Sequence, residues 1–146
     1  QNLGAGHPQR AERSVWIAGT VTMILLGLIS VAYLVGAEPL VRLFTDEAAV
    51  VAVGAQGLRV MALGYAIYAW SMTCPQAFNG AGDTLTPTWI NLGCYWALQI
   101  PLAWALAVPL GLDEGGVFWA VVAAETVASV VGAVLFRRGR WKATVV

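Results

Sequence analysis

The chain has 146 residues, of which 59% are hydrophobic and 11% are charged, and its formal net charge is zero. Soluble domains are about 45–50% apolar and about 25% charged, so this composition is typical of a membrane protein. Because acidic and basic residues balance, the chain has no broad basic surface, and we expect no nucleic-acid partner. His7 is the single histidine, which excludes a metal site built from several histidines; we expect neither metal nor cofactor.

Four long apolar runs account for most of the chain. Residues 14–37, 60–82 and 84–112 contain no Asp, Glu, Lys or Arg, and residues 115–136 contain only Glu125. A helix needs about 20 mainly apolar residues to cross the hydrocarbon core, and each run is long enough. The sequence therefore predicts an all-α polytopic membrane protein. Its transmembrane helices are expected at about 14–37, 60–82, 86–110 and 115–136.

The first connection is marked by helix-breaking and capping residues. Glu38-Pro39 is expected to end the first helix, because proline has no N–H for the hydrogen-bond ladder. Thr45-Asp46-Glu47 predicts an N-cap followed by acidic residues in the first turn of the next helix. The stretch after it is rich in Ala and Val and has no break signal, so it predicts one long helix over about 46–79.

Prolines and glycines divide the second half of the chain. In the third run, Pro87 predicts the start of a helix and Pro101 predicts a kink. Asp113-Glu114-Gly115-Gly116 then predicts a tight turn into the last helix, because such residues favour turn conformations.

The basic residues are distributed unevenly between the two sides that four crossings define. One side has Arg42 and Arg59, whereas the side that holds both termini has six basic residues. Lys and Arg concentrate on the cytoplasmic side of membrane proteins. We therefore expect a multi-pass protein of the cell (inner) membrane with both termini of this segment in the cytoplasm. The six are Arg10, Arg13, Arg137, Arg138, Arg140 and Lys142.

Glu125 lies at the midpoint of the last apolar run, roughly 15 Å from either end at 1.5 Å per residue. A bare carboxylate at this depth costs several kcal/mol, so the group is expected to be protonated, paired or next to a hydrated cavity. It shares a helical stripe with Phe118, Ser129 and Gly132, which predicts that it faces a helix interface. Three interpretations stay open: a proton or cation site, a neutral acid that serves packing, and an acid that faces lipid.

Polar residues also follow one face of the second and third apolar runs at helical spacing. Such stripes suit a water-filled cavity, and they suit interhelical hydrogen bonds worth about 0.6 kcal/mol each. Aromatic and amide groups together would bind a flat organic cation through stacking and cation–π contact. The candidate cavity residues are Tyr68, Gln76, Asn79, Asn91, Tyr95 and Gln99.

The sequence has no metalloprotease histidine pair, no phosphate loop with lysine and no serine elbow, so we do not expect an enzyme. A short sequence similarity occurs within the chain, which we call the echo: Gly4-Ala5-Gly6 and Gly80-Ala81-Gly82 each precede a polar residue, on the same predicted side of the membrane. The glycines allow a sharp turn, and the polar residue can cap the next helix. The echo is either a true repeat or a chance match.

Three motifs resemble the multidrug and toxic compound extrusion (MATE) transporters. They are Gln1-Asn2-Leu3-Gly4-Ala5-Gly6 with Arg10-Ala11, Leu43-Phe44-Thr45-Asp46-Glu47 with Val50, and Asn79-Gly80-Ala81-Gly82-Asp83-Thr84-Leu85-Thr86-Pro87. In that family a Gln-x-x-Gly-Ala-Gly segment precedes a membrane helix, and a Gly-Ala-Gly-Asp-Thr-x-Thr-Pro turn joins two others. The resemblance covers nearly the whole chain and implies that Gly80, Gly82 and Asp83 shape a cytoplasmic turn.

By order, the resemblance implies that residues 1–146 are the C-terminal part of such a transporter, the last four of twelve helices in its second lobe. The missing N-terminal helices would be its partners. It further implies export of cationic or amphipathic drugs or metabolites in exchange for H⁺ or Na⁺, by alternating access of two six-helix lobes. Some members carry an acid on the second of these four helices, where this sequence has Tyr68 near the expected position.

Two other functions stay open. A lipid-linked oligosaccharide flippase of the related superfamily would move an anionic head group, for which Arg or Lys at membrane depth would be expected; the apolar runs have none. A complete four-span interaction protein, in which Glu125 determines partner choice, is the other. Eight further spans encoded upstream would favour the exporter.

Overall fold

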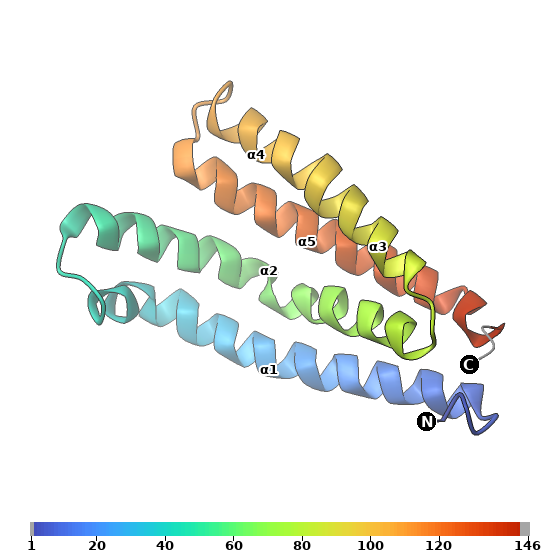
Figure 1. Cartoon of the computed structure of the whole chain (residues 1–146). Helices are drawn as coiled ribbons and strands as arrows, with labels where there is room; N and C mark the ends of the chain where they lie inside the picture. Colours follow the sequence, from blue (N-terminus) through green and yellow to red (C-terminus); the bar gives the residue numbers. More distant parts are fainter. Residues whose placement is uncertain (1, 144–146) are drawn as a thin grey trace.

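The computed structural model describes residues 2–143, which form helices and contain no strand. Four helices, each long and apolar enough to cross a membrane, lie side by side (Figure 1). The predicted all-α polytopic fold is confirmed. The helices are α1 (Pro8–Arg42), α2 (Ala48–Gly80), a third helix over Leu85–Ala107 and α5 (Asp113–Arg137), followed by the short 3₁₀-helix η2 (Arg140–Ala143).

Helix α1 continues past the residues that were expected to end it. Pro39 lies inside the helix, which ends only at Arg42. Proline removes one N–H donor, but the N–H groups of the residues after it can still donate to carbonyls of the preceding turn, so the last turn still forms. Glu38 and Arg42 form a 2.9 Å ion pair across this turn. Both side chains are about half exposed, so the pair contributes only about 0.3–0.5 kcal/mol.

Helix α2 confirms the single long helix predicted over about 46–79, but its start differs from the expected N-cap. The hydroxyl of Thr45 accepts a 3.2 Å hydrogen bond from the backbone N–H of Glu47. Glu47 is the N-cap residue and makes no side-chain cap bond. Because the Thr45 hydroxyl stabilises a local turn ahead of the helix, Asp46 and Glu47 precede the first helical turn instead of forming it.

The third helix changes its hydrogen-bond pattern along its length. It consists of α3 (Leu85–Asn91), the π-helix η1 (Leu92–Gln99) and α4 (Ile100–Ala107). Pro101 has no N–H to donate to the carbonyl four residues earlier, and the wider turns of η1 lie directly before this end of the helix. The irregularity expected around Pro101 is therefore spread along η1.

The turn into α5 lies before the residues predicted for it. The chain turns over 108–112, so the third span ends at Ala107 and not near residue 110. Asp113 and Glu114 belong to the first turn of α5, where acidic side chains face the positive end of the helix dipole. Gly116 allows close packing, because a Cβ there would lie 2.6 Å from the backbone nitrogen of Ala107.

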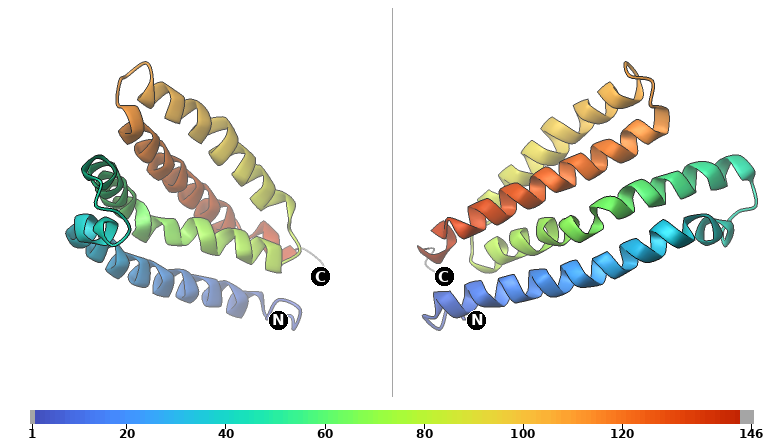
Figure 2. Two further views of the ribbon diagram at one scale, coloured as in Figure 1. Left: turned by 60° about the vertical axis from the view of Figure 1, so that its left-hand side comes forward. Right: turned by 180° about the vertical axis from the view of Figure 1, so that it is seen from behind.

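Helix α2 is the central helix, with α1 packed on one side and α5 on the other (Figure 2). Two contacts define its direction relative to α5. A Cβ at Gly57 would meet the Phe118 ring, and Cys74 lies against Gly132, so residue numbers rise together and the two helices are parallel. The α5 face of this seam is formed by small residues, which lets the backbones approach closely. These are the buried Ala120, Ala124, Ala128 and Gly132.

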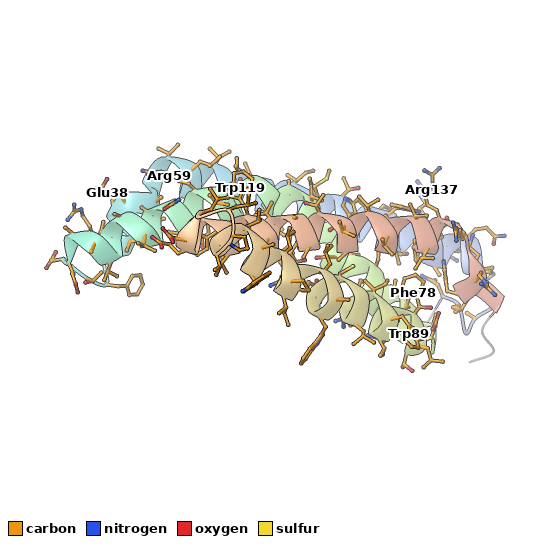
Figure 3. The ribbon with its side chains drawn as sticks, turned by 90° about the horizontal axis from the view of Figure 1, so that it is seen from above. Glu38, Arg59, Phe78, Trp89, Trp119 and Arg137 are labelled. Carbon is orange, nitrogen blue, oxygen red and sulfur yellow. The ribbon has the colours of Figure 1, made fainter. Side chains whose placement is uncertain are left out.

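Both termini lie at the same end of the four helices (Figure 1). At this end Lys142 forms a 2.6 Å ion pair with Glu12 of α1. Figure 3 shows Trp89 and Arg137 toward this end and Trp119 toward the opposite end. Tryptophan near both ends of an apolar bundle is the arrangement expected where helices meet the two membrane interfaces.

Candidate functional site at Glu125

Glu125 lies near the middle of α5, and its carboxylate faces α2 and η1. Its Oε2 atom accepts a 2.7 Å hydrogen bond from the Ser71 hydroxyl of α2 and a 3.0 Å bond from the Tyr95 hydroxyl of η1. The stripe on α5 that predicted an interface-facing acid therefore agrees with the structure. Three of the four membrane helices meet at one oxygen atom.

Within residues 2–143, the ion pairs are Glu38–Arg42 and Glu12–Lys142, so no basic side chain neutralises Glu125 there. The same residues hold no group of three or more His, Cys, Asp or Glu that could bind a metal ion. The two hydroxyl groups that donate to Glu125 are neutral, so they stabilise its negative charge only through their dipoles. A carboxylate in this setting is chemically suited to accept a proton or a cation.

A cavity of about 200 Å³ lies beside Glu125, between α2 and α5. Typical pockets for drug-sized ligands measure about 300–1,000 Å³. This space alone therefore suits an ion or a small part of a larger molecule. Its wall is mostly apolar and aromatic, and Glu125 supplies the single charge. The lining residues are Met61, Gly64, Tyr65, Tyr68, Val121, Val122 and Glu125.

A row of tyrosines extends from this cavity to α1. The rings of Tyr65 and Tyr68 lie 6.3 Å apart, and the ring of Tyr33 on α1 lies 5.7 Å from that of Tyr65. Together with Tyr95, these are all four tyrosines of the chain. Their ring faces and hydroxyl groups are well suited to a cation near Glu125.

Ser129 lies one turn after Glu125 on α5 and is buried. Its hydroxyl donates a 2.8 Å hydrogen bond to the Ile67 carbonyl and accepts a 3.1 Å bond from the Ser71 backbone N–H. In an unbroken α-helix these two backbone groups bond directly to each other. The Ser129 hydroxyl therefore bridges this donor and this acceptor, and the α2 ribbon bends near its middle (Figure 1).

Two of the six predicted cavity residues lie at this site, Tyr68 in the cavity wall and Tyr95 on the carboxylate. The side chains of the other four make no hydrogen bond within the described part of the chain. Helix α5 packs against both α2 and the third helix, and Glu125 accepts a hydrogen bond from one residue of each. The remaining four are the exposed Gln76, Asn79 and Asn91 and the half-buried Gln99.

Sequence reasoning did not identify Ser71 as a site residue, and it treated Ser129 only as a member of a stripe. Two of the tyrosines in the row were also missed. One signal was available, since Gly57, Gly64 and Ser71 follow each other at about two-turn spacing on α2 and are all buried. Small residues at that spacing indicate a face of α2 on which another helix packs closely. The Glu125 carboxylate lies against this face.

The turn between α2 and α3 contains the motif residues Gly80, Gly82 and Asp83. Gly82 has φ +80°, its N–H donates to the Asn79 carbonyl, and the Asp83 N–H donates to the Phe78 carbonyl, both at 3.0 Å. This pair of bonds is a Schellman motif, which ends a helix with one residue in the left-handed region. A Cβ at Gly80 would meet nothing within 4 Å, so the turn requires glycine at position 82 only.

Asp83 caps the start of α3. Its Oδ2 accepts a 2.6 Å hydrogen bond from the Thr86 hydroxyl, and its Oδ1 accepts a 3.0 Å bond from the Thr86 backbone N–H. Because both bonds favour the ionised form, they hold the pKa of Asp83 below its usual value. The residue therefore stabilises the turn and does not contribute to the Glu125 cavity.

The first copy of the echo adopts the same backbone turn. Gly6 has φ +77°, its N–H donates to the Leu3 carbonyl, and the His7 N–H donates to the Asn2 carbonyl, both at 2.9 Å. The copies differ at the polar residue, because the His7 side chain makes no cap bond. The shared Gly-Ala-Gly sequence thus corresponds to a shared helix-ending geometry.

These features define a polytopic membrane protein in which helices bring a carboxylate, hydroxyl groups and aromatic rings together at membrane depth. The model of the MatE family matches residues 1–105, and the chain belongs to this family. The predicted resemblance to MATE transporters is confirmed.

Relatives and one solved structure cover nearly the whole chain. Protein DETOXIFICATION 41 of Arabidopsis thaliana is 24% identical over 98% of this chain and 28% of that protein. The probable multidrug resistance protein NorM of Aromatoleum aromaticum is 32% identical over 93% of this chain and 30% of that protein. The MATE transporter ClbM in complex with Rb⁺ shares the fold, with a TM-score of 0.88 and 24% identity over 97% of this chain and 34% of its own. The chain thus spans about a third of the length of these proteins.

Proposed function

We propose that these four helices are the C-terminal portion of the second lobe of a cation-coupled exporter. Its cargo would be cationic or amphipathic drugs or metabolites, and Glu125 would load and release the coupling ion. The observation that carries this proposal is the Glu125 carboxylate, which receives hydroxyl donors from two other helices. An ionisable group at this depth is costly, and such groups are therefore found mainly on ion or substrate pathways.

Chemistry at the site favours H⁺ as the coupling ion. Hard metal cations prefer several oxygen ligands, and Na⁺ would need oxygen lone pairs directed at one point. The hydroxyls of Ser71 and Tyr95 both direct their hydrogens at Glu125 Oε2. A proton needs no further ligand, because the carboxyl group itself binds it. The name of the relative NorM supports drug efflux, and the Rb⁺ complex of ClbM supports the binding of a cation by a transporter of this fold.

The surroundings of Glu125 favour an organic cation as cargo. The tyrosine row offers ring faces, and the cavity wall contains no Lys or Arg. A lipid-linked flippase would need such basic side chains for its anionic head group, so the site supports the exporter over the flippase. The cavity is small, and we propose that the preceding helices of the transporter complete the substrate site.

The distribution of charge supports an inner-membrane location with both termini of this segment in the cytoplasm. Arg137 and Lys142 lie at the end of the helices that holds the termini (Figure 3). The turn with Gly82 and Asp83 lies at the same end in Figure 1. Since basic residues concentrate on the cytoplasmic side, this end is assigned to the cytoplasm.

The test is transport by the complete transporter that contains this chain, reconstituted in liposomes with an imposed H⁺ or Na⁺ gradient and ethidium as the organic cation. We expect the H⁺ gradient to drive exchange and Glu125→Gln to abolish its dependence on pH, because glutamine keeps the shape but binds no proton.

The matched control is Glu114→Gln, which removes an exposed acid from the first turn of the same helix. It should transport like the wild type. Exchange by Glu125→Gln at the wild-type rate and with the wild-type pH dependence would overturn the role of Glu125. Exchange driven by Na⁺ alone would overturn the choice of H⁺.

A further inference from the structure

The hydrogen-bond ladder of α2 is irregular at both backbone groups of Ser71. Its N–H donates to the Ser129 hydroxyl of α5, and that hydroxyl donates to the Ile67 carbonyl. The Ser129 oxygen thus bridges two groups that bond directly in a regular α-helix. The Ser71 carbonyl faces Pro75 four residues later, and proline has no N–H to donate. The ladder is therefore bridged by a side chain of α5 on one side of Ser71 and lacks a donor on the other, which weakens the resistance of α2 to bending there.

The Ser71 side chain contacts the carboxylate that the proposed function makes the proton site. Its hydroxyl lies 2.7 Å from Glu125 Oε2 and 3.0 Å from the Tyr68 carbonyl of the same helix. A hydroxyl has one hydrogen and can donate to only one of these acceptors at a time. The bond from Ser71 to Glu125 on α5 and the bond from Ser71 to the backbone of α2 therefore exclude each other.

The charge of Glu125 decides which of these two bonds forms. An ionised carboxylate is the stronger acceptor, so it takes the Ser71 hydrogen and ties α2 to α5. A protonated carboxyl needs an acceptor for its own hydrogen, and the Ser71 oxygen can provide one. The Ser71 hydroxyl is then free to donate to the Tyr68 carbonyl, next to the turn that Ser129 bridges.

We propose that Ser71 is the hinge of α2, that Ser129 keeps this hinge open, and that the Ser71 hydroxyl transmits the charge state of Glu125 to it. Both serines are positioning residues. The proposal rests on the proposed function of Glu125. It adds how loading of a proton on α5 would change the shape of the central helix.

The surroundings of Glu125 leave few other groups that could mediate such a response. From α2, Tyr65 and Tyr68 face it across the cavity, and from η1, Tyr95 donates to it while Cys94 lies nearby. Within residues 2–143 no Lys, Arg or His forms an ion pair with it. A pH response of α2 that depends on Glu125 would therefore pass through hydroxyl groups.

The structural test measures the distance between the two ends of α2 in the complete transporter by electron paramagnetic resonance. Spin labels would be attached at Val50→Cys and Gly80→Cys, both exposed and both in α2, after Cys74→Ala and Cys94→Ala remove the two thiols of residues 1–146. At the rise of an α-helix these sites are about 45 Å apart, a distance that the method reaches. We expect the distribution to shift between alkaline and acidic pH in the wild type.

Ser129→Ala restores a direct Ile67–Ser71 bond, and we expect it to abolish this shift. Ser71→Ala serves as a second variant, because it leaves Ser129 in the ladder and removes only the link to Glu125. The matched control is Ser30→Ala. Ser30 is also buried and donates a 2.6 Å bond to the Ala62 carbonyl of α2, but it does not insert into the ladder. This control should shift like the wild type.

Transport separates the two proposals. In the ethidium assay, Ser129→Ala should slow H⁺-driven exchange by roughly two- to thirtyfold, the range known for residues that couple two sites. If Ser129→Ala and Ser71→Ala keep the full pH-dependent shift in distance, the hinge is wrong. That result leaves the proposed function intact as long as Glu125→Gln still abolishes pH-dependent exchange. If Glu125→Gln transports normally, the proposed function is wrong and the hinge proposal ends with it.

Discussion

The hydroxyl of Tyr95 donates a 3.0 Å hydrogen bond to Glu125 Oε2 and so joins the π-helical part of the third helix to the middle of α5. Tyr95→Phe removes only this donor and keeps the ring. Interhelical hydrogen bonds in membranes are worth about 0.6 kcal/mol, and bonds to charged groups about 1.5–3 kcal/mol. We expect a loss of about 1 kcal/mol in the free energy of unfolding, measured by denaturation in detergent.

The control for this substitution is Tyr33→Phe, since the Tyr33 ring packs on Tyr65 but its hydroxyl makes no side-chain hydrogen bond within residues 2–143. It should change stability little. Equal effects of the two substitutions would show that the Tyr95 hydroxyl makes no specific contribution at Glu125.

Gly116 allows α5 to pack against the end of α4. A Cβ at this position would lie 2.6 Å from backbone atoms of Leu106 and Ala107, which cannot move independently. We expect Gly116→Ala to destabilise the protein by about 1–3 kcal/mol, the usual cost of overpacking. Thermal unfolding in detergent measures the effect.

Its neighbour Gly115 provides the comparison. A Cβ there would lie 2.9 Å from the amide nitrogen of Gln56, the mobile end of an exposed side chain. Gly115→Ala should therefore be tolerated. If both substitutions lower the melting temperature equally, close backbone contact is not the reason for glycine at position 116.

Gly82 is required for the turn between α2 and α3, because its φ of +80° lies in the left-handed region. Alanine there costs roughly 1–2 kcal/mol, and we expect Gly82→Ala to lower the melting temperature accordingly. Gly80→Ala should be neutral or stabilising by up to about 1 kcal/mol, because Gly80 is helical and has open space around its Cα. A larger loss at position 80 than at 82 would contradict this assignment.

Asp83 should make stability depend on pH in the acidic range. Hydrogen bonds from Thr86 lower its pKa in the folded state relative to about 3.9 in unfolded chains. Its contribution is therefore fully present above the unfolded pKa, and it is lost as the pH falls through the lower folded pKa. Asp83→Ala should cost about 1 kcal/mol at neutral pH, the typical value of a cap.

The measurement for Asp83 compares melting temperatures of wild type and Asp83→Asn from neutral to acidic pH. Asparagine keeps a capping oxygen but cannot ionise, so the difference between the two proteins should shrink as the pH falls. A difference that is constant over the whole range would contradict a role for the carboxylate charge.

Several features of the fold could be predicted without coordinates. Apolar length identified all four membrane helices, and the absence of break signals predicted that α2 is continuous. Breaks near helix ends were predicted less well. Pro39 does not end α1, and the turn before α5 lies at 108–112, because the last turn of a helix tolerates a missing donor and local residue preferences are weak beside packing.

The site at Glu125 was predicted only in part. The stripe on α5 correctly indicated an interface-facing acid, but it could not identify Ser71 or Tyr95 as its partners. Helical spacing describes which residues share a face of one helix. It carries no information about the height at which that face meets a neighbour, which depends on how α2 and α5 are aligned along their lengths.

Hydrophobic length, charge distribution and motifs are properties of the linear sequence, and they determined that this chain contains four membrane helices and belongs to the MatE family. The tertiary structure decided that Ser71, Tyr95 and Ser129 meet around Glu125 and that a hydroxyl of α5 bridges the α2 ladder there. The physical reason is close packing. Small residues on α5 let two parallel helices approach until their polar groups must satisfy one another, and that pairing exists only between helices.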